Sequence, residues 1–259
     1  MLGCQMAESM PKLYVLPGSH PCDAVEAALR LKGIRFRRVD LLPIVPLLAG
    51  PLLYGGGTVP GMRIGRERLV GSRPIMRRLD ALAAEPPLLP AAGEEAREQV
   101  LEAERWGDEV LQPVPRRLID AAFLRAPASI ESYAGDAKLP VPRPLLRASL
   151  PLTARAMALK NRAGDAAARA DLIALPGLLD RVDAWVQEGI LGGEQPNAAD
   201  LQIGSSIRLL ASIGDIAPLV AGRRCERLVA YFPPLAGSVP AGALPPEWLA
   251  AAAPASAAG

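Results

Sequence analysis

Aromatic residues are scarce in this sequence: Phe, Trp and Tyr make up only 4% of its 259 residues, although half of all residues are hydrophobic. The core must therefore be built mainly from Leu, Ala, Val and Ile. Ala and Leu are among the strongest helix formers, so the composition favours a chain rich in helix. At 27.2 kDa, the chain is long enough for one large domain or two of medium size.

Cysteine is scarce as well. Cys4, Cys22 and Cys225 are odd in number, lie far apart and lack the spacing of zinc ligands. The sequence therefore indicates neither a disulfide framework nor a metal site.

Long hydrophobic runs and an excess of one charge are also missing. No segment reaches about 18 uninterrupted apolar residues, as a membrane-spanning helix would need, and the N-terminus lacks the basic start and apolar run of a secretory signal. The 29 basic and 27 acidic residues are nearly balanced, which gives no nucleic-acid footprint. We therefore expect a cytoplasmic protein with no nucleic-acid and no membrane partner.

The first third of the chain alternates strand and helix signals. Short apolar runs and Gly/Pro punctuation predict strands over residues 12–16, 34–41, 62–64 and 68–70, and helices over 21–32 and 72–82. Gly33 is placed to end the first helix, and residues 43–57 are either irregular or a weak helix. The strand–helix–strand order calls for a parallel pair with a right-handed crossover. Together these signals predict a thioredoxin-like domain over residues 11–84.

A linker rich in Pro and Gly follows, and beyond it the pattern becomes wholly helical. We predict an all-helical domain over residues 94–232, with Pro113 and Pro115 separating helices at 94–112 and 116–125, and a loop over 126–150. The clearest helix carries apolar residues from Leu175 to Ile190 at helical spacing. Residues 233–259 are so rich in Pro, Ala and Gly that much of this tail is expected to be mobile.

Asn197 and Asp200 precede an apolar run, which is a variant of the helix capping box, with Asp in place of the usual Glu. Three more landmarks come earlier in the chain: Ser19-His20-Pro21-Cys22, Thr58-Val59-Pro60 and Gly71-Ser72. In order and separation over about residues 12–230, the four landmarks resemble those of the glutathione transferase family. The resemblance implies an α+β thioredoxin-like domain followed by an all-α domain, and it is compatible with a homodimer.

Ser19 is the candidate catalytic residue. It lies where the first strand meets the N-terminus of a helix, and its hydroxyl could donate a hydrogen bond to a thiolate. It lies fourteen residues before Gly33, the spacing that the serine and cysteine classes of the family resembled here use. A plain helix cap is the alternative for Ser19. Tyr14, the candidate of the tyrosine class, is one residue out of phase and is expected to pack in the core.

The run Ser19-His20-Pro21-Cys22 also resembles the thioredoxin pattern C-x-P-C with its first cysteine replaced by serine, which argues against disulfide exchange. Cys22 is more consistent with a small core residue than with a nucleophile. His20, the only histidine, lies at the rim of the same site. It could act as a base, but an exposed side chain without a role is the commoner case.

The resemblance also implies where a thiol would bind. The backbone of Val59, before a cis-Pro60, would pair with the peptide of glutathione. Ser72, at a helix N-terminus, would bind its γ-glutamyl carboxylate. A helix cap alone is the alternative for Ser72, and an ordinary turn proline is the alternative for Pro60. Gly71 stands where the family has Glu or Gln, so one ligand contact is missing and the identity of the thiol is open.

We therefore expect no tightly bound cofactor, and glutathione or another low-molecular-weight thiol as cosubstrate for attack on an electrophile. A non-catalytic binding or interaction protein of the same fold is the alternative.

Overall fold

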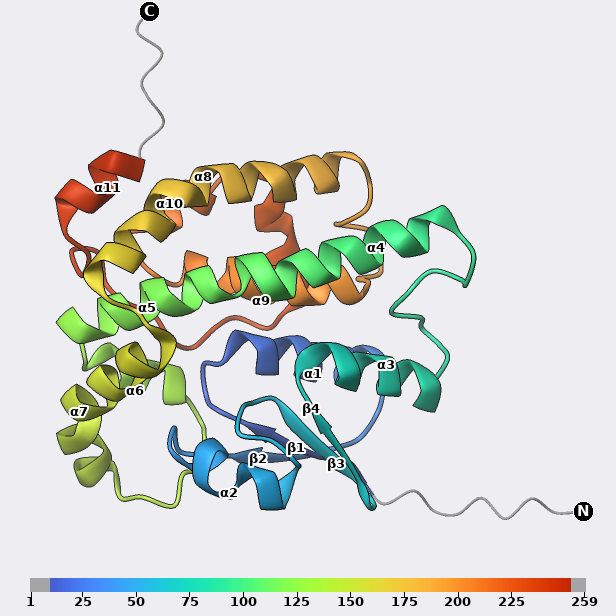
Figure 1. Cartoon of the computed structure of the whole chain (residues 1–259), viewed down its shortest axis with the longest axis horizontal. Coiled ribbons are helices and arrows are strands. Elements are labelled where there is room, and N and C mark those ends of the chain that lie inside the picture. The colour runs from blue at the N-terminus through green and yellow to red at the C-terminus, as the bar shows by residue number, and fades with distance from the viewer. Residues whose placement is uncertain (1–9, 253–259) are drawn as a thin grey trace, which may run out of the picture. The chain divides into compact units, whose positions relative to one another are not determined.

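The computed structural model describes residues 10–252. Contacts divide the chain into two compact units (Figure 1). Unit 1 runs to residue 88 and includes residues 137–139, and unit 2 contains residues 89–136 and the chain from 140 onward.

Unit 1 contains a four-stranded mixed sheet in the order β2-β1-β3-β4. The pair β1–β2 is parallel, whereas β1–β3 and β3–β4 are antiparallel. The predicted four-stranded thioredoxin-like sheet is thus confirmed. Its elements are β1 (Lys12–Val15), α1 (His20–Leu31), β2 (Arg37–Asp40), α2 (Val45–Leu53), β3 (Gly61–Ile64), β4 (Glu67–Val70) and α3 (Ser72–Leu82).

Helices cover both faces of this sheet: α1 and α3 lie on one face and α2 on the other (Figure 1). The alternation along β1 follows this layering, since successive strand residues point to opposite faces. Tyr14 packs with Leu41 and Tyr54 in a cluster that includes Val45 and Leu53 of α2. Leu13 and Val15, which are fully buried, therefore point to the α1 and α3 side.

Unit 2 is helical. Its elements are α4 (Glu95–Trp106), a π-helical turn η1 (Gly107–Leu111), α5 (Pro113–Arg125), α6 (Ser129–Ala134), α7 (Arg143–Asn161), α8 (Asp165–Gln187), α9 (Ala198–Ala211), α10 (Ala217–Val220), a 3-10 helix η2 (Arg224–Tyr231) and α11 (Pro246–Ala252). Between residues 95 and 252, the only β pairing is an isolated bridge between Ile213 and Val239.

Helix α9 is buried along nearly its whole length and packs against α4 and η2. The predicted capping box at its start is confirmed: the Asn197 side chain accepts from the Asp200 amide at 3.0 Å, and Asp200 accepts from the Asn197 amide at 2.9 Å. The predicted apolar face of α8 is also buried, at Leu175, Leu179 and Val182.

The prediction that Pro113 and Pro115 separate two helices is only partly right. Both prolines lie in the first turn of α5, where a missing N–H is tolerated. The Gln112 amide bonds to the Gly107 carbonyl at 2.9 Å, so the π-helical turn carries the chain from α4 into α5.

The predicted loop over residues 126–150 is wrong, because α6 and the start of α7 fall within it. Pro142 is the N-cap of α7 and Pro144 lies in its first turn, so these prolines begin a helix instead of preventing one.

The expectation of a mobile tail fails for its middle part. Val239, Leu244 and Trp248 are buried, and α11 packs against α8. The composition misled because small and Pro-rich segments can still dock through a few large side chains. Residues 253–259 lie outside the described part of the chain.

Candidate active site

The strand register brings three loops to one end of the sheet. Tyr14 near the end of β1 pairs with Gly61 at the start of β3, and Gly61 pairs with Val70 at the end of β4. The loop after β1 carries Ser19, the residues before β3 include Val59 and Pro60, and the residues after β4 are Gly71 and Ser72. The predicted thiol-activating and thiol-binding residues therefore meet at the same end of the sheet.

Ser19 is the N-cap of α1, with an extended backbone conformation. Its carbonyl accepts hydrogen bonds from the amides of Cys22 and Asp23, at 2.9 and 3.1 Å. Its side chain makes no capping hydrogen bond to the helix. The Ser19 hydroxyl therefore does not form the hydrogen bond of an ordinary N-cap.

Cys22 lies in the first turn of α1, 1% exposed. Burial raises the pKa of its thiol to about 12, although a hydrogen bond with the Ser19 side chain acts in the opposite direction. The thiol is therefore protonated at neutral pH, and a protonated thiol is a poor nucleophile. These properties are those of the core residue that the sequence favoured for Cys22.

The prediction of an exposed side chain for His20 is wrong. His20 is the first residue of α1 and is only 3% exposed. Pro21 and Cys22, which follow it, are buried as well, so this side of the helix start is enclosed.

The Val59–Pro60 peptide bond is cis, as the family resemblance implied. Val59 is half-buried, and its N–H and C=O make no backbone hydrogen bond with other residues of the described chain. An extended peptide could pair with these groups in the manner of an added strand.

Gly71 and Ser72 form the start of α3. Gly71 is the N-cap, with φ 90° and ψ 153°, a left-handed conformation that favours glycine. Its N–H donates to the Pro60 carbonyl at 2.9 Å. Ser72 is 3% exposed and begins an eleven-residue helix, whose N-terminal amides and dipole favour an anion.

Tyr14 belongs to the core, as expected. It is 6% exposed, and its ring lies 5.1 Å from that of Tyr54. Its side chain therefore points to the α2 side of the sheet, which argues against a role in thiol activation.

Tyr54 is a residue of this region that the sequence did not reveal. It is fully buried, and its hydroxyl has no hydrogen-bond partner among the described residues. Burial, followed by the charge of Cys22, raises its pKa to about 12. A Cβ on Gly61 would come within 2.2 Å of the Tyr54 ring, so this ring supports the backbone that follows cis-Pro60.

Among residues 10–252, no group of His, Cys, Asp and Glu side chains is arranged to hold a metal ion. In the same part of the chain, no helix has both the length and the apolar character to cross a membrane.

Residues 13–87 match the family model for the glutathione S-transferase N-terminal domain. This part of the chain is therefore similar to the N-terminal domain of glutathione transferases. Ser19, the cis-Pro60 turn and the start of α3 all lie inside the matched segment. No curated protein sequence matches the chain.

Solved structures of glutathione transferases share the fold of this chain at low sequence identity. Glutathione transferase F7 from Populus trichocarpa has a TM-score of 0.56 and 16% identity, with 86% of this chain and 91% of that chain covered. A glutathione S-transferase from Xylella fastidiosa gives 0.54 and 20%, with coverage of 86% and 90%. One from Sinorhizobium meliloti gives 0.52 and 18%, with coverage of 90% and 97%. These likenesses establish the two-part glutathione transferase architecture.

Proposed function

We propose that this chain activates glutathione or a related low-molecular-weight thiol for conjugation to an electrophile, with Ser19 as the activating residue. The observation that carries the proposal is the hydrogen bond from the Gly71 amide to the Pro60 carbonyl. This bond holds the Val59–Pro60 segment, which can pair with a peptide, against the N-terminus of α3, which can bind an anion. A γ-glutamyl peptide offers both an extended backbone and a carboxylate.

The activation step depends on the thiolate. A free thiol has a pKa near 8.5 and is mostly protonated at neutral pH. A hydrogen bond from the Ser19 hydroxyl to the sulfur would contribute about 1.5–3 kcal/mol, which lowers the pKa of the bound thiol by about one to two units. The thiol proton passes to solvent, and a sulfur lone pair then forms the bond to the electrophilic carbon. The electron pair of the bond broken at that carbon departs with a leaving group, or, where a double bond opens, takes up a proton from solvent.

Ser19 has a competing neighbour, because its side chain acts to lower the pKa of the nearby Cys22 thiol. This contact is expendable, since a protonated Cys22 can accept or donate only weakly. A bound thiolate is a charged acceptor and would attract the hydroxyl more strongly.

The binding of the thiol would use main-chain groups and one hydroxyl. The Val59 N–H and its carbonyl, whose contact with the Thr58 hydroxyl is long at 3.5 Å, would pair with the peptide. Ser72 with the first amides of α3 would bind the γ-glutamyl carboxylate. Gly71 supplies no side-chain acceptor, so affinity for glutathione should be about ten- to a hundredfold lower than with Glu at this position.

Steady-state conjugation assays test the assignment of Ser19, with an electrophile on which the wild type shows measurable turnover. Ser19→Ala should lose turnover about ten- to a hundredfold, Ser19→Thr should retain part of it, and Cys22→Ser should stay near the wild type once its folding is checked by circular dichroism. Loss of turnover in Cys22→Ser alongside an active Ser19→Ala would overturn the assignment. Thiol binding without turnover on any electrophile would favour the non-catalytic alternative.

A further inference from the structure

Four basic residues form one continuous row across all four strands of the sheet. Lys12 of β1 is in register with Arg37 of β2 and with Arg63 of β3, and Arg63 is in register with Arg68 of β4. Residues paired directly across neighbouring strands point to the same face, with their Cβ atoms about 5 Å apart. Lys12, Arg37 and Arg68 are exposed and Arg63 is half-buried.

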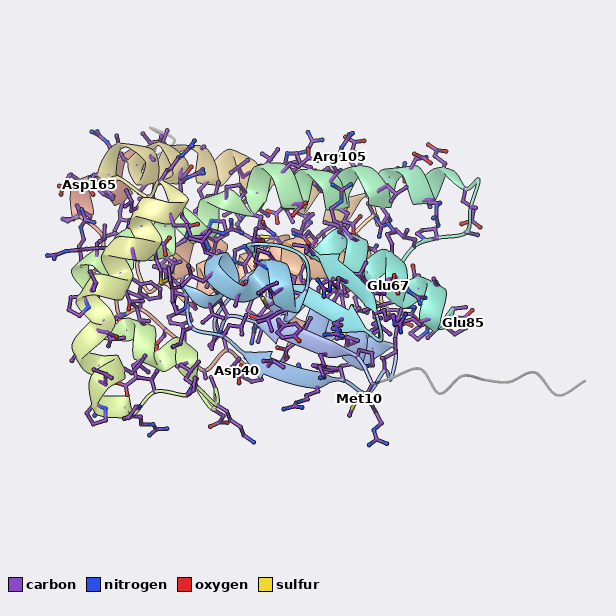
Figure 2. All side chains as sticks on the ribbon, turned by 60° about the horizontal axis from the view of Figure 1, so that its bottom comes forward. Met10, Asp40, Glu67, Glu85, Arg105 and Asp165 are labelled. Atoms are coloured by element: carbon purple, nitrogen blue, oxygen red, sulfur yellow. The ribbon has the colours of Figure 1, made fainter. Side chains whose placement is uncertain are left out.

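This cationic row lies on the α2 side of the sheet, the side that Figure 2 turns toward the viewer. Lys12 is two residues before Tyr14 and so shares its face, and Tyr14 packs toward α2. The row is thus the part of this face that α2 leaves open.

Like charges placed directly opposite each other in a sheet destabilise it. The carboxylates of unit 1 that form ion pairs do so elsewhere: Glu26 and Asp40 with Arg38, Glu67 with Arg78, and Asp80 with Lys32. Within residues 10–88, the row therefore carries a positive charge that no ion pair neutralises.

The helix beside the row exposes a second feature, a patch of large apolar side chains. Helix α2 contains no charged residue, and four side chains on it or directly before it are exposed by 56–77%: Ile44, Leu47, Leu48 and Leu52. Arg68 joins the two features, because its guanidinium donates to the Pro51 carbonyl of α2 at 3.5 Å. The apolar patch and the cationic row therefore form one surface, which we call the α2 face.

We propose that the α2 face docks on an anionic lipid surface, with the leucines of α2 entering the headgroup region and the cationic row attracting the lipid phosphates and carboxylates. An exposed apolar helix face combined with basic side chains is the pattern by which proteins lie on membranes without crossing them. The expectation of no membrane partner rested on the lack of a spanning segment, which such a contact does not need.

A second copy of the chain fits this face less well. A two-fold pairing places the same patch on both sides of the interface, so it would bring two cationic rows into one interface without supplying acidic partners. A nucleic acid or polyphosphate would engage the row but leave the leucines of α2 in water. Of these three partners, only the lipid surface matches both the cationic row and the apolar patch.

Co-sedimentation of the full chain with phosphatidylcholine vesicles, with or without phosphatidylserine, tests the proposal. Wild type should bind vesicles that contain phosphatidylserine, and less so as salt screens the charges. The double variant Lys12→Gln/Arg37→Gln should bind about twenty-fivefold more weakly, from about fivefold for each basic side chain. Leu48→Gln/Leu52→Gln should bind at least about tenfold more weakly.

Matched controls change the same chemistry elsewhere: Arg105→Gln/Arg169→Gln removes two exposed charges from unit 2, and Ile173→Gln removes an exposed apolar side chain. Both should bind as wild type does. The urea midpoint of Lys12→Gln/Arg37→Gln should be unchanged or slightly higher. If the row stabilised the fold, the midpoint would be lower.

The proposal is overturned if wild type ignores phosphatidylserine vesicles, or if the α2-face variants bind them as well as the controls do. It is also overturned if Leu48→Gln/Leu52→Gln converts a dimer to a monomer in sedimentation equilibrium. None of these outcomes depends on thiol conjugation, so they leave the proposed function untouched.

Discussion

The amide of Gly71 donates a hydrogen bond of 2.9 Å to the carbonyl oxygen of Pro60. This bond joins the cis-proline turn to the start of α3. Gly71 can make it because its φ of 90° is accessible to glycine and strained for other residues. Glycine at position 71 therefore provides no side-chain acceptor, but it allows the backbone to adopt this conformation without strain.

Replacement of Gly71 should separate these two effects. Gly71→Ala and Gly71→Glu should both lower the free energy of unfolding by about 1–3 kcal/mol, because each places a side chain at positive φ. The nearest atom to an added Cβ is Pro74 Cδ at 3.6 Å, so no clash adds to the strain. Urea unfolding measures this cost.

The Glu side chain should also restore a ligand contact. We expect Gly71→Glu to bind glutathione about ten- to a hundredfold more tightly than Gly71→Ala, as measured by titration calorimetry. Comparison with the Ala variant cancels the backbone strain. Absence of detectable glutathione binding in wild type and both variants would remove glutathione as the cosubstrate, and binding of a different thiol would identify its replacement.

Tyr54→Phe should stabilise the protein. The exchange removes a buried hydroxyl that has no hydrogen-bond partner among the described residues, and such a group destabilises by about 1–3 kcal/mol. Tyr54→Ala should instead destabilise by about 3–5 kcal/mol, because the ring packs on Gly61 and Tyr14. If Tyr54→Phe lowers thiol turnover while the fold is intact, the hydroxyl contacts the substrate and its assignment to the core is wrong.

The capping box at the start of α9 should carry measurable stability. Asn197→Ala removes two hydrogen bonds of the side chain. One is accepted by Asn197 Oδ1 from the Asp200 backbone N–H, and the other is donated by Asn197 Nδ2 to the Ile190 carbonyl at 2.9 Å. We expect a loss of about 1–2 kcal/mol in the free energy of unfolding. Glu94→Ala is the control, since the N-cap of α4 makes no side-chain capping bond. Equal losses in the two variants would contradict a specific role of the box.

The parts of the fold that could be predicted from sequence rest on local signals. The end of α1 at Gly33 follows from a glycine just past the last turn, and the span of α3 follows from its apolar spacing. The cis bond at Pro60 came from the family resemblance, whereas the helix start at Ser72 was predicted from the sequence pattern. These signals need only a few neighbouring residues.

The parts that could not be predicted depend on contacts distant in sequence. Tyr54 matters because Gly61 allows its ring to approach the backbone, and the cationic row exists only in the register that aligns Lys12 with Arg63. The prolines from Pro113 to Pro144 misled for a different reason. A proline in the first turn of a helix and a proline that ends one look alike until the backbone is known.

Asp120 should make stability fall as pH rises. It is fully buried on α5, with one carboxylate oxygen accepting from the Asn161 amide at 2.7 Å and the other without a hydrogen-bond partner in the described chain. Burial raises its pKa from 3.8 to about 6, although Asn161 and the charges of Arg116 and Lys160 oppose the shift. The folded state therefore holds a proton that the unfolded chain has released.

The sign follows from linkage. Below pH 3.8 the group is protonated in both states and its stabilising contribution is complete, and this contribution is lost as pH rises to about 6. The loss amounts to about 3 kcal/mol at most. Asp120→Asn stays neutral throughout, so its stability relative to wild type should increase by up to this amount between about pH 4 and pH 7. Urea unfolding across this range measures the difference, with Asp136→Asn as a control at an exposed carboxylate. A relative stability of Asp120→Asn that is flat with pH, or that falls, would show that the buried carboxylate is ionised at no cost to the fold.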